Sequence, residues 1–254
     1  MFAPLFLLAA LQVITFTEVG SSELGSTVTV SGRCQDLCPS GSVSIGAGEI
    51  IGRRSDGKLL VLTARHVIER ATSLVVFVRN GASPGIEFAS FSRIAAGRRA
   101  TVVAYAANVD LALVAFTPLH ADQYNFAPIA ASWITNESQP GVIVGDPNGS
   151  LWTVSSYSFL RGNANTFELS CDTCGPGDSG GGVFDASGKL LGIVVQQAID
   201  GDSAGRTSQF RAVALPEMKM FLRVTGTDNV ISERAHDTDA WKRFDTMRSR
   251  FRRT

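Results

Sequence analysis

Residues 175–182 read Gly-Pro-Gly-Asp-Ser-Gly-Gly-Gly, a stretch with five glycines in eight residues. A strand in a buried core would not tolerate so many residues without side chains to pack. The glycines on both sides of Ser179 allow positive backbone φ angles and a close approach to a ligand. An apolar segment, VFDASGKLLGIVV, follows directly at 183–195. The stretch therefore predicts a loop that holds one serine in a special position, with an ordinary hairpin turn as the alternative.

A catalytic serine needs a general base, and the base needs an orienting carboxylate, because serine is a weak nucleophile at neutral pH. The chain has three histidines, His66, His120 and His236. Of these, only His66 ends an apolar segment, in LTARHV, where a buried scaffold could fix its ring. Asp110 opens the apolar segment DLALVAF, where a carboxylate is costly to bury without a partner. A structural histidine and a strand-capping aspartate are the alternatives for these two residues.

Short apolar segments of strand type recur between residues 42 and 215, separated by Gly, Pro, Ser and Asn. This spacing predicts an all-β protein with two similar sets of about six strands, joined by a connector at 117–128. Residues 216–222 begin with proline and predict a helix after the last strand. The expected strands lie at 42–52, 59–68, 73–79, 98–106 and 110–116, and at 141–146, 151–160, 166–170, 181–185, 189–199 and 208–215.

In this order, LTARHV, DLALV and GDSGGG resemble the three catalytic segments of the chymotrypsin-like serine proteases, over roughly residues 40–222. The segments GVIVGDPNG, GKLLGIVVQQAI and FRAVALPEM are similar to the HtrA/Deg-like or "trypsin-2" branch. The resemblance implies two six-stranded antiparallel β-barrels followed by a C-terminal helix. It also implies a serine endopeptidase that acts on proteins or peptides through an acyl-enzyme, without a metal or other cofactor.

The resemblance assigns a role to each motif residue. His66 becomes the general base, Asp110 its orienter and Ser179 the nucleophile, and the backbone N–H groups of Gly177 and Ser179 form an oxyanion hole. The chain departs from the branch at Asp178, since HtrA-type proteins commonly have asparagine before the serine. We expect an internal arginine or backbone amides to hold Asp178, so that no activating cleavage is needed.

Substrate specificity is also read from the resemblance. It places Thr173 on the floor of the S1 pocket and Val195, Gln196 and Gln197 on its wall. The floor position holds no aspartate, so a trypsin-like preference for Arg or Lys is not supported. The sequence instead predicts a small or medium uncharged residue before the scissile bond.

Four cysteines form two close pairs, Cys34 with Cys38 and Cys171 with Cys174. An even number of cysteines in an exported chain favours disulfides, and two short-spaced pairs also fit a structural zinc site. Sequence alone does not choose the pairing. In either case the second pair would brace the serine loop that follows it.

The ends of the chain differ from its middle. Residues 2–16 are almost continuously apolar, which predicts a signal peptide over 1–21 and a secreted or periplasmic protein. An N-terminal helix or strand packed on the body is the alternative. We expect an N-terminal extension at 22–41, a protease domain at 42–222 and a basic tail at 223–254, with no PDZ-type domain. The barrels within the protease domain are expected at about 42–118 and 128–222.

The composition is that of a globular protein, with 44% hydrophobic and 18% charged residues. The formal net charge is zero, so the whole chain has no nucleic-acid footprint. Within 241–253, aromatic residues and Met247 recur at near-helical spacing among arginines. This tail predicts a surface helix packed on the second barrel, or a basic amphipathic helix that contacts an anionic membrane or nucleic acid.

Two other interpretations of the chain remain open at this point. The first is a viral polyprotein-processing protease of the same fold, in which the apolar N-terminus would be a membrane segment. The second is a protease-fold binding protein that has lost its activity. The sequence does not indicate an oligomeric state.

Overall fold

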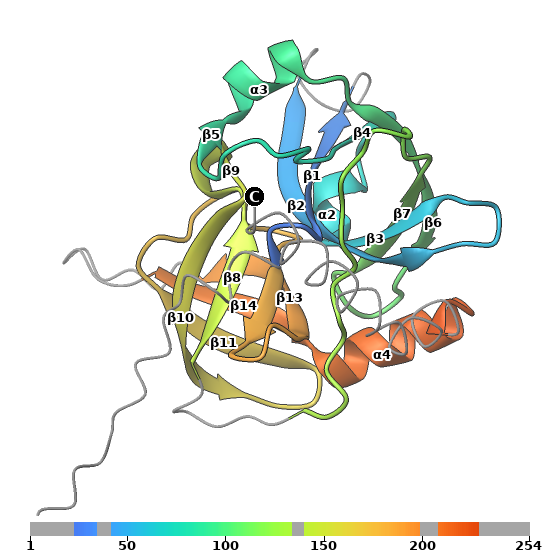
Figure 1. The fold of residues 1–254 in the computed structure, drawn as a ribbon. Helices are drawn as coiled ribbons and strands as arrows, with labels where there is room; N and C mark the ends of the chain where they lie inside the picture. The colour runs from blue at the N-terminus through green and yellow to red at the C-terminus, as the bar shows by residue number, and fades with distance from the viewer. Residues whose placement is uncertain (1–22, 35–41, 134–139, 199–207, 229–254) are drawn as a thin grey trace, which may run out of the picture.

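The structure is a computed structural model that describes residues 23–34, 42–133, 140–198 and 208–228 (Figure 1). The predicted signal peptide and the predicted basic helix at 241–253 lie outside these ranges. Within them, no helix is both long enough and apolar enough to cross a membrane.

Two closed antiparallel barrels of six strands each form the molecule, one above the other in Figure 1. This confirms the predicted fold class. Barrel one has the order β1-β2-β3-β7-β6-β4 and barrel two the order β10-β11-β14-β13-β12-β8. The strands of barrel one are β1 (Thr27–Arg33), β2 (Val43–Arg53), β3 (Leu59–Thr63), β4 (Ser73–Phe77), β6 (Arg98–Tyr105) and β7 (Ala112–Phe116). Those of barrel two are β8 (Gly141–Gly145), β10 (Thr153–Gly162), β11 (Thr166–Cys171), β12 (Gly182–Asp185), β13 (Leu190–Ala198) and β14 (Ser208–Ala214).

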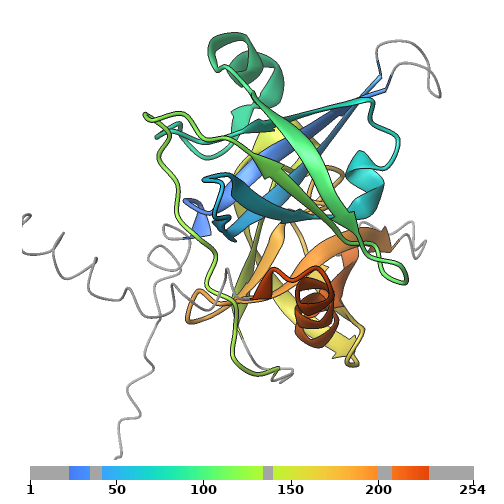
Figure 2. The same cartoon turned by 90° about the vertical axis from the view of Figure 1, so that its right-hand side faces the viewer.

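Short elements connect and cover the barrels. The strands β5 (Ile86–Glu87) and β9 (Ser150–Leu151) pair with each other and so join a loop of barrel one to a loop of barrel two. The helices are α2 (Arg65–Ile68), α3 (Phe88–Ile94) and α4 (Leu215–Val224), with a 3-10 turn η1 at Pro147–Gly149. The predicted C-terminal helix is α4, which lies beside β13 and β14 of barrel two (Figure 2).

Barrel one begins earlier than the expected boundary at residue 42. Strand β1 lies within the stretch 22–41 that the sequence assigned to an extension, and it supplies the sixth strand of this barrel. Its polar residues concealed it. Thr27, its first residue, and Ser26, just before it, are buried, and the hydroxyls of both donate hydrogen bonds to Glu49 on the neighbouring strand β2. The correct boundary of the barrel is therefore Thr27.

Apolar packing joins the two barrels. One buried cluster fills barrel one and continues into the junction with barrel two, and a second fills barrel two. At the junction the ring of Phe91, from α3, packs edge-on against the fully buried Trp152, with 4.8 Å between ring centroids. Burial of such large side chains stabilises the fold by about 1.5–3 kcal/mol each. The junction can therefore hold residues from different barrels in fixed positions.

Candidate active site

The two barrels bring His66, Asp110 and Ser179 together. His66 lies in α2, directly after strand β3, Asp110 lies just before β7, and Ser179 lies in the loop between β11 and β12. Asp110 accepts hydrogen bonds from the His66 backbone N–H at 2.9 Å and from its ring Nδ1 at 2.6 Å. The other ring nitrogen, Nε2, lies 2.9 Å from Ser179 Oγ. The three predicted residues thus form one continuous hydrogen-bonded chain.

Electrostatics in this chain suit a general base. The hydrogen bond to Asp110 raises the pKa of His66 above its ordinary value, against the opposing effect of burial. Burial by itself would raise the pKa of Asp110, but its hydrogen bonds to the His66 ring and backbone lower it below its usual range. Asp110 is therefore ionised at neutral pH, and it favours the tautomer with the proton on Nδ1. Nε2 is then free to accept a proton from Ser179.

Both barrels hold the backbone of the serine loop. The Ala47 N–H of β2 donates to the Ser179 carbonyl at 2.8 Å, and the Gly180 N–H donates to the Val194 carbonyl of β13 at 2.7 Å. Gly177 and Gly180 have φ angles of +107° and +88°, where side chains are disfavoured. A Cβ at Gly180 would lie 2.0 Å from the Ala47 carbonyl oxygen, so the loop also needs a glycine there for space.

The backbone amides predicted as an oxyanion hole have no competing partners in the loop. Among the described residues, neither Gly177 nor Ser179 donates its N–H to a backbone carbonyl. The neighbouring amides of Asp178, Gly180 and Gly181 all do so. The two amides that the resemblance assigned to the oxyanion hole are therefore the two that remain available within 177–181.

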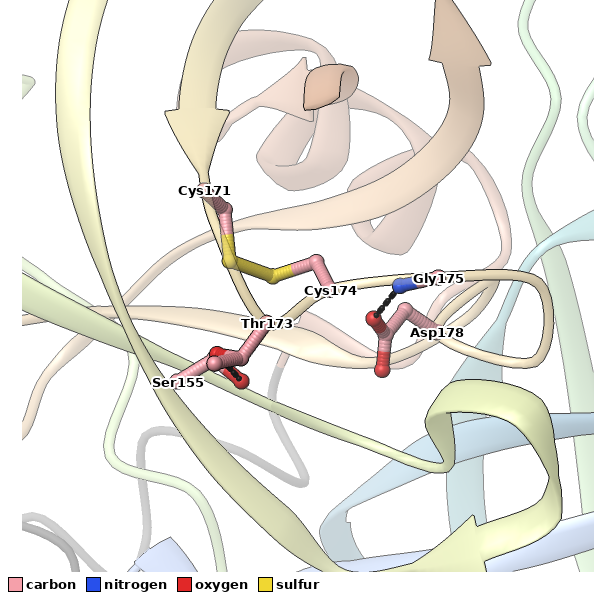
Figure 3. The surroundings of a disulfide bond; sticks show 6 residues. All are labelled: Ser155, Cys171, Thr173, Cys174, Gly175 and Asp178. Atoms are coloured by element: carbon pink, nitrogen blue, oxygen red, sulfur yellow. Dashed lines mark hydrogen bonds between the residues drawn. A yellow bond between two sulfur atoms is a disulfide. The ribbon is translucent and has the colours of Figure 1, made fainter. Parts of the chain in front are cut away.

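Asp178 is buried next to the serine and is held by a backbone amide. The Gly175 N–H donates to its Oδ2 at 2.8 Å (Figure 3). Burial raises the pKa of Asp178 to about 7. Of the two partners expected from the sequence, the structure shows the amide, and no arginine among the described residues forms an ion pair with this carboxyl.

Two further buried carboxyls lie close to this loop, and the sequence did not single them out. Glu49 accepts hydrogen bonds from Ser26, Thr27 and the Gly182 N–H, and Asp146 accepts one from the Trp152 N–H. Burial raises the pKa of each to about 8. Because Gly182 opens β12, Glu49 links barrel one to the segment that follows the serine.

A disulfide braces the approach to the serine loop. Cys171 and Cys174 are bonded to each other with 5.6 Å between their Cα atoms, so for this pair the disulfide alternative is correct and the zinc alternative is wrong. Between them, Thr173 donates from Oγ1 to Ser155 Oγ of β10 at 2.8 Å (Figure 3). Cys34 is disulfide-bonded as well. Cys38 lies outside the described residues.

A cleft of about 530 Å³ opens beside the triad. Of the four predicted substrate-binding residues, Val195 and Gln196 line this cleft and Thr173 does not. The backbone of Gln197 lies opposite Phe210 in the pairing of β13 with β14, and the structure does not describe the side chain of Gln197. Sequence reasoning missed the remaining lining residues, which are Asn108, Val109, Thr166, Arg211 and Val213.

Comparison with known proteins agrees with this architecture. A family model described as a trypsin-like peptidase domain matches residues 40–193. No curated protein sequence matches the chain. Among solved structures, the active form of the Rv3671c protease from M. tuberculosis is similar, with 21% identity, a TM-score of 0.60, and coverage of 88% of this chain and 93% of that one. The inactive form of that protease has 22% identity and a TM-score of 0.59, covering 85% and 96%. The chain belongs to the trypsin-like peptidase family and is a serine peptidase.

Proposed function

We propose that the protein is an endopeptidase that cleaves peptide bonds through a His66–Asp110–Ser179 triad and a covalent acyl-enzyme. The observation that carries this proposal is the pair of contacts made by the His66 ring, 2.6 Å to Asp110 on one side and 2.9 Å to Ser179 Oγ on the other. Serine is activated when a base lies within hydrogen-bond reach of its hydroxyl and a carboxylate orients that base.

In the acylation step, His66 Nε2 takes the hydroxyl proton as Ser179 Oγ attacks the carbonyl carbon of the scissile bond. Asp110 stabilises the imidazolium that forms. His66 then gives the proton to the leaving amine as the C–N bond breaks, which leaves the acyl group on Ser179. Water, deprotonated by His66 in turn, attacks the ester carbon. The bond between this carbon and Ser179 Oγ then breaks, the acid product leaves, and His66 returns the proton to Ser179 Oγ.

The carbonyl oxygen becomes an oxyanion in the tetrahedral intermediate. The amides of Gly177 and Ser179 would donate to this oxygen, because they make no backbone hydrogen bonds within the described residues. A single donor of this kind contributes about 10²–10³ to kcat in such enzymes. The formed hydrogen-bond chain and the available amides favour this activity over a protease-fold protein that only binds peptides.

Digestion of a peptide library, with product identification by mass spectrometry, tests the activity. We expect internal cleavage by the wild type and none by Ser179→Ala of equal folding, judged by circular dichroism. An initial burst of the first product would report the acyl-enzyme. A folded wild type that cleaves no peptide in the library would contradict the proposal.

We also propose that the protein acts outside the cytoplasm. The apolar stretch at 2–16 and the Cys171–Cys174 disulfide support this, since structural disulfides persist in oxidising compartments. Expression in the native host followed by N-terminal sequencing of the mature protein provides the test. A mature chain that still begins at Met1 and stays in the cytoplasm would contradict export.

A further inference from the structure

The triad shares its cleft with a charged side chain that the mechanism above does not use. Arg211 lines the cleft together with His66, Ser179 and Gln196. It lies on β14, opposite Gln196 of β13 and opposite Glu168 of β11 in the strand pairing. Its position is therefore fixed by the sheet of barrel two.

Two neighbours orient the guanidinium of Arg211. One terminal nitrogen donates to Gln196 Oε1 at 3.3 Å, and the other lies 3.2 Å from Glu168 Oε1. A guanidinium has five N–H donors in a planar fork. The described residues provide these two acceptors, and the side chain is still 42% exposed. Donors thus remain for an acceptor that enters the cleft.

Glu168 is not a partner of Arg211 alone. It is shared between Arg211 and Arg161, whose Nε lies 2.6 Å from Glu168 Oε2. Hydrogen bonds from Arg161 and Arg211 lower the pKa of Glu168, so it carries a full negative charge at neutral pH. The negative charge of Glu168 is therefore divided between two guanidinium groups.

The charges that line the cleft are unevenly placed. Among the described residues that line the cleft, Asp110 is the only carboxylate, and it is bonded to His66. Arg211 is the only lysine or arginine among these described lining residues. A peptide that reaches Ser179 therefore passes close to an oriented cation with spare donors.

We propose that Arg211 is a specificity-determining residue that binds an acidic side chain of the substrate, Asp or Glu, close to the scissile bond. This inference rests on the proposed peptidase function and adds a substrate class to it. A planar guanidinium pairs with a carboxylate through two parallel hydrogen bonds, which gives direction as well as attraction. Gln196 assists by fixing the plane of the guanidinium.

Arg161 provides a matched control for the purely structural role. It bonds to the same Glu168 but does not line the cleft, and its side chain is 76% exposed. If Arg211 served only to tie β14 to β11, its loss and the loss of Arg161 would act alike, and neither would change the ranking of substrates.

The experiment uses peptide pairs that differ by Glu against Gln at successive positions on both sides of the scissile bond. We expect the wild type and Arg161→Gln to prefer the acidic peptide at one position by about tenfold in kcat/KM. The ratio should fall to about one in Arg211→Gln. The Arg211→Glu variant should instead prefer a peptide with lysine at that position. No acidic preference in the wild type at any position, or a preference that survives in Arg211→Gln, would overturn the inference.

A second experiment, which measures binding without cleavage, separates this inference from the catalytic proposal. Calorimetry with Ser179→Ala, alone and combined with Arg211→Gln, compares the affinities of the same Glu and Gln peptides without cleavage. We expect about tenfold tighter binding of the acidic peptide only where Arg211 is present, and weaker discrimination as salt is raised. Equal affinities in both backgrounds would refute the role of Arg211, whether or not the wild type cleaves peptides.

Discussion

The backbone N–H of Ala47 donates a hydrogen bond to the carbonyl oxygen of Ser179 across the junction of the two barrels, at 2.8 Å. Strand β2 of barrel one thus holds the residue proposed as the nucleophile, although that residue belongs to a loop of barrel two. On the other side, the Gly180 N–H is bonded to Val194 of β13. The serine is held from both barrels, so its position depends on how they pack together.

Substitution of Gly180 by alanine should push the serine loop away from Ala47 of β2. A Cβ would lie 2.0 Å from the Ala47 carbonyl, and the φ of +88° would be strained as well. The control is Gly57→Ala, since Gly57 has a similar φ of +82° with nothing within 4 Å of the added carbon. We expect Gly57→Ala to cost about 1–2 kcal/mol in urea denaturation and to keep peptidase activity. Gly180→Ala should cost more than about 3 kcal/mol and abolish activity, whereas equal effects would contradict the account.

The activity should depend on pH through His66. Its pKa is raised by the hydrogen bond to Asp110, and only the neutral ring can accept the Ser179 proton. kcat/KM should therefore be lost as pH falls through this raised pKa and be constant above it, until other groups titrate. Asp110→Asn should lower kcat by about 10⁴. A pH–rate profile that is flat from pH 5 to 8 would be incompatible with His66 as the base.

The stability should decrease as pH rises towards 8. Burial raises the pKa of Asp178 to about 7, and of Glu49 and Asp146 to about 8, well above the values of about 4 expected in the unfolded chain. The folded state then binds more protons than the unfolded state between about pH 4 and 8, so the free energy of unfolding falls across this window. Carboxyls whose pKa is lowered in the folded state, such as Asp122 beside Arg98, stabilise the fold at neutral pH. They lose this stabilising contribution only when the pH falls below the window described above. Maximum stability is thus expected at mildly acidic pH.

Urea denaturation at pH 5 and pH 8 measures this difference, and Asp178→Asn isolates one group. Asparagine can still accept the hydrogen bond from Gly175 but cannot ionise, so the loss between the two pH values should be smaller in the variant. A wild type that is more stable at pH 8 than at pH 5 would disprove this explanation.

Removal of the Cys171–Cys174 disulfide should weaken the approach to the serine loop. Closing so short a loop stabilises the folded chain by about 2 kcal/mol in the chain-entropy model. We expect the variant with both Cys171→Ser and Cys174→Ser to lose about this much stability. It should also lose part of its kcat, because Gly175, which follows Cys174 directly, holds Asp178 through a hydrogen bond. Unchanged stability and kcat in the variant would show that the bond has no such role.

Motifs with strong local chemistry were predictable from the sequence. The strand spacing predicts an all-β protein. The motifs around Ser179, His66 and Asp110 carry the family resemblance that implies two barrels and the roles of these three residues. Other features depend on pairing between distant segments. Strand β1 has the polar composition of an extension, and the burial of Thr27 beside Glu49 becomes visible only once β1 is paired with β2. Arg211 looked like an ordinary strand residue, since only the register of β14 against β13 places it at the cleft.

The most direct test of the central claim is labelling of the folded protein with a fluorophosphonate probe, followed by mass spectrometry to locate the adduct. The account predicts one adduct, on Ser179, in the wild type, and none in Ser179→Ala or His66→Ala of equal folding. An adduct on another serine, or labelling of His66→Ala at the rate of the wild type, would contradict the proposed triad.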